Sequence, residues 1–84
     1  MTNPVLAEAA AAVGTDVMWL THETRIREVV RERQEAMLWL FENRGMSATS
    51  IAGAMGLDRT TIDYGIKKAR ERRAARQQQN TTPE

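Results

Sequence analysis

Apolar residues recur at helical spacing in several stretches of the chain, and no stretch shows the alternation typical of a strand. The longest such stretch runs from about Ile26 to Asn43. Its broad face comprises Ile26, Val29, Val30, Arg33, Met37, Leu40 and Phe41. The run from Ala36 to Phe41 is apolar on every side. This pattern predicts a long central helix whose second half is buried.

Two short helices are predicted before the central one. Asn3 and Pro4 are typical of a helix start, and Gly14 is suited to the end of that helix. The apolar positions between them are Val5, Leu6, Ala9, Ala12 and Val13. Thr15 and Asp16 can cap a second helix, which carries Val17, Met18 and Leu20. Residues 21–25 are predicted to form a loop.

Two further helices are predicted after the glycine at position 45, which suits a left-handed helix end. Ser47 or Thr49 caps the first of them, which ends at Gly56. Asp58 caps the second through its carboxylate, and that helix continues to about Arg76. Its inward face carries Ile62, Ile66 and Ala69. A tight turn between two helices is typical of a helix-turn-helix.

The predicted fold is therefore all-α, a single helical domain of about five helices over residues 1–76. The helix-turn-helix occupies residues 47–76, and residues 77–84 form a polar tail that we expect to be disordered. Eighty-four residues allow one small core. The chain has no cysteine, no apolar run of membrane-spanning length and no glycine-rich phosphate loop. We expect a cytoplasmic, nucleoid-associated protein without enzymatic activity, cofactor, metal, membrane association or small-molecule substrate.

The charge is distributed unevenly although the net charge is only +1. Residues 1–58 carry five arginines against eight acids, a balance of −3. Residues 59–76 carry seven basic residues against two acids, a balance of +5, and Glu84 contributes the last −1. Because a local excess of positive charge attracts phosphate groups, the last helix is the part of the chain suited to bind nucleic acid.

The start of this last helix has the chemistry of a DNA-reading helix. Asp58, Arg59, Thr60 and Thr61 form its first turn, and Lys67 and Lys68 follow. Hydroxyl, carboxylate and guanidinium groups are those that read base edges in the major groove. Arg59 opposes the helix macrodipole, so its position favours a role in ligand binding. Asp58 is explained equally well as a helix cap, and several of the basic residues as solvated ones.

Three blocks together resemble the C-terminal DNA-binding domain of the bacterial replication initiator DnaA, over about residues 6–72. Residues 25–37, RIREVVRERQEAM, are similar to the family pattern R-x-R-x-x-x-R-P-R-Q-x-A-M. Residues 47–52, SATSIA, fall where the family has S-L-P-E-I-G. Residues 58–68, DRTTIDYGIKK, fall on D-H-T-T-V-x-H-A-x-x-K.

The resemblance implies a set of contacts with duplex DNA. The aspartate, arginine and two threonines at positions 58–61 would read the major groove, and Arg25 would reach the adjacent minor groove. Arg33 and Gln34 would contact phosphates, and Lys68 the backbone. The expected DNA-binding residues are Arg25, Arg27, Arg33, Gln34, Thr49, Asp58, Arg59, Thr60, Thr61, Lys67 and Lys68.

The chain departs from the family pattern at informative positions. The family histidine is Arg59, which pairs best with guanine O6 and N7. The prolines of the first two blocks are Glu32 and Thr49, and a double glycine is reduced to Gly56. We therefore expect the binding mode to persist with an altered target sequence, bound by a monomer, in regulation of replication or transcription and without ATPase activity.

The alternative is a protein-interaction module that binds or inhibits a replication or transcription protein. Its candidate surface is the acidic half of the chain, which contains Glu8, Asp16, Glu28, Glu32, Glu35 and Glu42. Arg27, Arg31 and Arg33 interrupt this surface and disfavour a strongly negative face.

Overall fold

Five α-helices follow one another in the parts of the chain that the computed structural model describes, residues 4–21 and 26–80, with side chains as far as residue 76. They are α1 (Pro4–Val13), α2 (Val17–Thr21), α3 (Arg27–Asn43), α4 (Ala48–Met55) and α5 (Arg59–Asn80). No strand occurs in these ranges. The prediction of a small all-α fold is confirmed.

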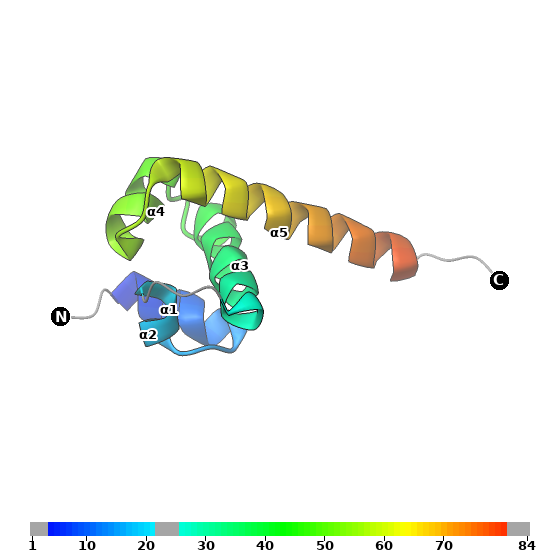
Figure 1. Ribbon diagram of the computed structural model, residues 1–84, viewed down its shortest axis with the longest axis horizontal. Coiled ribbons are helices and arrows are strands. Elements are labelled where there is room, and N and C mark those ends of the chain that lie inside the picture. Colours follow the sequence, from blue (N-terminus) through cyan, green and yellow to red (C-terminus); the bar gives the residue numbers. More distant parts are fainter. Residues whose placement is uncertain (1–3, 22–25, 81–84) are drawn as a thin grey trace.

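Helix α3 is the centre of the fold and contacts each of the other four helices. Figure 1 shows α1 and α2 against one end of α3, and α4 with the start of α5 against the other. Ala36, Met37, Leu38 and Leu40 are at most 1% exposed, which confirms that the second half of α3 is buried. The helix ends at Asn43, and Gly45 has the left-handed φ of 64° expected there.

The edge of this apolar run is less buried than its composition predicts. Phe41 is 38% exposed, and the guanidinium carbon of Arg70 lies 5.2 Å from the centroid of its ring. Trp39 is half-buried and packs against the core. The side of α3 that carries Phe41 is covered by a long cationic side chain rather than by another apolar element. A prediction of burial from the apolar run alone therefore overestimates how buried Phe41 is.

Helices α1 and α2 form a short pair against α3. Leu6, Ala9 and Ala10 are buried, whereas Ala12, expected on the inward face, is exposed. Asp16 Oδ1 accepts a hydrogen bond of 3.3 Å from the Met18 N–H, so the predicted cap of α2 forms. The predicted cap of α1, Asn3, lies outside the described residues.

Helix α5 is longer than predicted. It continues to Asn80, four residues beyond Arg76, so residues 77–80 are helical where a disordered tail was expected. Glutamine is a good helix former and no glycine or proline interrupts residues 66–80, which explains the extension. The 22 residues correspond to about 33 Å of helix. The structure measures 51 × 22 × 22 Å, and the end of α5 extends past the other helices (Figure 1).

Helices α3 and α5 approach each other most closely at Gly65. This residue is buried, and a Cβ atom there would overlap Met37 Sδ and lie 3.3 Å from Gln34 Cγ. The absence of a side chain lets the backbone of α5 lie directly on α3. Ile62, Ile66 and Ala69 flank this position and are at most 6% exposed. The crossing therefore fixes the direction in which α5 leaves the core.

Candidate nucleic-acid interface

Helices α4 and α5 form a helix-turn-helix with a three-residue turn, Gly56 to Asp58. Ser47 Oγ accepts the Ser50 N–H at 3.1 Å and caps α4. Gly56 adopts a left-handed φ of 71°, and the Leu57 N–H donates to the Ala52 carbonyl at 3.0 Å. Leu57 packs against the core. The turn is thus held by backbone bonds and an apolar anchor, both of which orient the start of α5.

The first turn of α5 presents its polar side chains to solvent. Asp58, Arg59, Thr60 and Thr61 are all exposed, whereas the next residue, Ile62, is completely buried. The Ile62 N–H donates to the Asp58 carbonyl at 3.1 Å, which starts the helix. We call residues 58–61 the reading turn, because they occupy the position from which a helix-turn-helix contacts base edges.

The predicted capping role of Asp58 is wrong. In the described part of the chain no N–H group of the first turn donates to its carboxylate, so only its backbone carbonyl serves the helix. Leu57 and the Gly56 turn fix the backbone without help from the side chain. The carboxylate still lies at the positive end of the helix, where a negative charge is favourable. Its oxygen atoms are free to accept hydrogen bonds from a ligand.

Arg59 is the one cation among residues 58–61 of the reading turn. Its side chain is 70% exposed, and its Nε lies 3.6 Å from Asp63 Oδ2 one turn later on the same helix. Exposed pairs of this kind contribute little stability, so the guanidinium can exchange Asp63 for another acceptor at small cost. Asp63 also orients the side chain along the outer face of α5.

The basic residues behind the reading turn divide into two groups. Lys67 is exposed and has no ion pair within the described residues. Lys68 lies 3.3 Å from Glu71 and 5.7 Å from the Tyr64 ring centroid. Arg72 and Arg73 instead turn back toward α3. The seven basic residues at positions 59–76 therefore offer a ligand less positive charge than their number suggests.

Arg73 and Glu42 form the best-defined ion pair between α3 and α5. Both nitrogen atoms Nη1 and Nη2 donate to the carboxylate, at 2.9 and 2.8 Å. These hydrogen bonds lower the pKa of Glu42 below its usual value and raise the pKa of Arg73. Arg73 thus serves to fix α5 on α3, and its charge is largely used within the molecule.

Some of the DNA-binding residues expected from the first two blocks of the resemblance are accessible to a ligand, and others are not. Arg27 is exposed at the start of α3, and Arg25 lies outside the described residues. Arg33 is only 8% exposed, so its predicted phosphate contact does not fit this structure. Gln34 is half-buried, and its Oε1 accepts a hydrogen bond from Arg72. Thr49 is exposed on the first turn of α4.

The engagement of Gln34 follows from the α3–α5 crossing. Gln34 lies on the face of α3 that α5 covers near Gly65. The helical spacing of Ile62, Gly65, Ile66 and Ala69 places Arg72 on the same inward face. That spacing could have identified Arg72 as an internal residue from the sequence. Its partners on α3 could not be identified without the structure.

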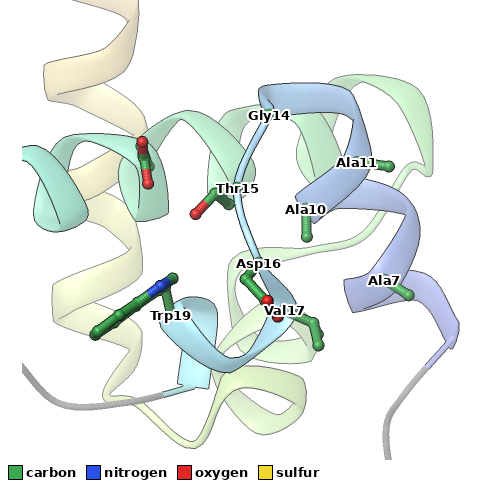
Figure 2. A pocket seen from close by; sticks show the side chains of 9 residues that line it. Ala7, Ala10, Ala11, Gly14, Thr15, Asp16, Val17 and Trp19 are labelled. Carbon is green, nitrogen blue, oxygen red and sulfur yellow. The ribbon is translucent and has the colours of Figure 1, made fainter.

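A separate hollow of about 610 Å³ lies where α1 and α2 meet α3. Figure 2 shows Ala7, Ala10 and Ala11 on one side of it and the Trp19 ring on another. Its charged lining residues are Asp16 and Glu32, with no basic residue. This hollow is therefore unsuited to phosphate and belongs to the acidic half of the molecule.

No protein family, curated protein or solved structure was found to match this chain. Within residues 4–21 and 26–80, no cluster of three or more potential metal ligands occurs. No helix in that part of the chain is both long and apolar enough to cross a bilayer. The exposed reading turn and the charges around it are therefore the features of this chain that bear on its function.

Proposed function

We propose that this chain binds duplex DNA sequence-selectively through α4 and α5, in the manner implied by its resemblance to the DnaA C-terminal domain. The observation that carries the proposal is the reading turn. Four consecutive polar residues are exposed at a helix start, and the buried Ile62 and the half-buried Leu57 anchor them to the core. A rigid element that supports accessible polar groups is what base recognition requires.

In the proposed mode the start of α5 enters the major groove. Arg59 donates to guanine O6 and N7 after leaving Asp63, and Asp58 accepts from a cytosine amino group. The exposed side chains of Thr60 and Thr61 contact a thymine methyl group through their own methyl groups, or donate to a phosphate through their hydroxyls. Thr49 and Lys67, exposed on α4 and α5, contact the flanking backbone.

The structure changes the set of phosphate contacts that the resemblance implies. Arg33 is left out of the proposed set because it is buried, whereas Gln34, whose Oε1 accepts from Arg72, keeps its amide NH₂ as a donor. Arg27 remains available at the start of α3, and Lys68 is available after its weak pair with Glu71 opens. Arg25, which lies outside the described residues, remains the proposed minor-groove contact. The resulting protein would occupy DnaA-box-like sites in the nucleoid and regulate replication or transcription there.

Fluorescence anisotropy with labelled duplexes tests this proposal. One duplex carries a DnaA box, one a scrambled sequence, and one has guanine in place of the thymines that the family histidine would face. Wild-type protein should bind one of the two designed sites tightly and selectively, with an affinity that falls steeply with salt. Weak, equal binding to all three duplexes would refute the proposal.

Two variants assign the readout. Arg59→Ala should lose about 1–3 kcal/mol on the preferred duplex and little on the scrambled one, because a base contact is removed. Arg76→Ala is the matched control, since it removes one exposed arginine of the same helix far from the reading turn. Its effect should be small and equal on all duplexes. If Arg59→Ala keeps wild-type selectivity, another residue reads the base.

The acidic hollow supports the second candidate, a protein-interaction module. Asp16 and Glu32 lie in it beside Trp19, a combination suited to a basic, partly apolar segment of a partner. Three of the other acids in this half are already neutralised: Glu8 by Arg44, Glu35 by Arg72 and Glu42 by Arg73. In nuclease-treated lysate, the module would capture a replication or transcription protein, and Glu32→Lys should abolish that capture without changing binding to the duplexes.

A further inference from the structure

A cleft of about 290 Å³ lies between the first half of α3 and the middle of α5. It is lined by Arg27, Val30, Arg31, Gln34 and Arg72. Three of these five residues carry a guanidinium group, and none carries a carboxylate. The chain thus concentrates positive charge in a concave site at a distance from the reading turn.

Arg72 is fixed in this cleft by hydrogen bonds to α3. Its Nη1 donates to Gln34 Oε1 at 2.9 Å, and its Nη2 donates to Glu35 Oε2 at 3.0 Å. Its Nε lies 3.3 Å from the same carboxylate oxygen. The guanidinium is therefore held in one orientation before any ligand arrives, which lowers the entropic cost of binding.

Arg27 and Arg31 are available to bind a ligand, because they are not engaged in ion pairs within the described residues. They lie four residues apart on one face of α3, and both are exposed. Neither guanidinium forms an ion pair within the described residues. Like charges at this spacing repel each other, and an anion between them would remove the conflict.

The balance of charge and donors favours an anion. Three guanidinium groups against the one carboxylate of Glu35 leave a formal charge of +2 at the cleft. Gln34 uses its carbonyl oxygen for Arg72, so its amide NH₂ remains as a further donor. Planar guanidinium groups match the oxygen atoms of a phosphate, which they bind with two parallel hydrogen bonds.

We infer that this cleft binds a phosphate of the DNA backbone, as a second point of attachment besides the reading turn. The inference rests on the proposed function. Arg72 follows Arg59 by 13 residues, which corresponds to about 20 Å along α5. This distance is shorter than the ~34 Å of one turn of duplex, so one duplex can reach both sites. The cleft takes over the phosphate contact that the buried Arg33 does not make.

The salt dependence of duplex binding tests the inference with the full chain. Arg31→Ala should make the slope of log K against log salt shallower by about 1, with an equal loss of affinity on selective and scrambled duplexes. The double variant Arg27→Ala/Arg31→Ala should extend the change to about 2. Arg44→Ala, which removes one exposed arginine paired with Glu8, is the matched control and should leave the slope unchanged. Equal slopes for Arg31→Ala and Arg44→Ala would overturn the inference.

A titration with inorganic phosphate separates this inference from the proposed function. The Nε–H signals of Arg27, Arg31 and Arg72 should shift saturably in NMR spectra, whereas that of Arg44 should not. Saturable shifts without any duplex binding would refute both the proposed function and the assignment of the cleft to the DNA backbone, leaving a site for a free phosphate compound. Selective binding that depends on Arg59, with unchanged slopes and no saturable shift, would refute the cleft alone.

Discussion

The two parts of α5 use the same kinds of residue for opposite purposes. In the reading turn, Asp58 and Arg59 are both exposed, and Arg59 has only a loose contact with Asp63. In the middle of the helix, Arg72 and Arg73 bind Glu35 and Glu42 of α3 at 3.0 and 2.8 Å. The difference arises from what lies opposite each part: carboxylates of α3 face the middle, and solvent faces the start.

This difference shows that the charge of a helix and the charge it can offer a ligand are separate quantities. Counting residues assigns +5 to positions 59–76. The pairs of Arg72 and Arg73 with α3 reduce the free excess to about +3, and the remaining free cations are unevenly placed. A basic helix packed on an acidic one therefore has its free positive charge at its ends and clefts rather than along its whole length.

The largest expected effect on stability comes from comparing two neighbouring residues, one beneath the reading turn and one on it. Ile62→Ala should lower the free energy of unfolding by about 2–5 kcal/mol, because it removes a fully buried side chain beneath the turn. Thr61→Ala, one residue earlier and exposed, should change it by less than about 0.5 kcal/mol. Urea unfolding followed by circular dichroism measures both. Similar losses for the two variants would show that the reading turn is part of the core.

The next effect concerns the middle of α5. Gly65→Ala should destabilise the protein by about 1–3 kcal/mol, because the new Cβ overlaps Met37 Sδ at the helix crossing. Gly53→Ala is the matched control: no atom lies within 4 Å of a Cβ there, so it should stabilise by about 0.5–1 kcal/mol through helix propensity. Shifts of opposite sign in the urea midpoint support the close crossing, and stabilisation by both variants would contradict it.

The two helix starts of the helix-turn-helix provide a smaller contrast. Ser47→Ala should cost about 0.5–2 kcal/mol, since Ser47 Oγ accepts the Ser50 N–H. Asp58→Asn should change stability by less than about 0.5 kcal/mol, because it loses a charge near the helix dipole but no hydrogen bond. The same variant should weaken selective DNA binding. A loss of stability at Asp58 equal to that at Ser47 would restore the capping role to its carboxylate.

The smallest effect is the pH dependence from the α3–α5 ion pair. Hydrogen bonds from Arg73 lower the pKa of Glu42 below 4.5, so its contribution to stability is present above that pH and is lost as the pH falls through the lowered pKa. Glu42→Gln should be slightly less stable than wild type at pH 7, and the two should converge in acid. Glu32→Gln, without an ion pair in the described part, is the control. A gap that persists at about pH 2 would exclude the pair as its cause.

The architecture was largely accessible from the sequence because local rules agreed with the fold. Helical spacing, Ser47, Gly45 and Gly56 predicted the helices and their ends within a few residues. Predictions that depended on other elements failed more often. Phe41 is partly exposed because Arg70 rather than an apolar helix covers it, and Arg33 is buried although it is charged.

The part of the candidate site that neighbouring residues of the chain form, the reading turn, could be predicted from the sequence. The reading turn is one helix turn, so its exposure follows from the inward positions of Ile62 and Leu57. The basic cleft joins residues 27–34 to Arg72 across 38 or more positions of the chain. Its formation depends on the close packing of α5 on α3, which the absence of a side chain at Gly65 allows. Local sequence patterns do not show that residues so far apart in the chain lie together.

The extension of α5 past the other helices has a consequence for how the molecule opens. Backbone amides up to about Arg73 are protected by packing on α3, whereas those that follow have only the hydrogen bonds of the helix itself. Deuterium should therefore replace protons at the end of α5 orders of magnitude faster than at Met37 or Leu40. Trypsin should cleave first after Arg76, and the shortened protein should keep its cooperative unfolding transition.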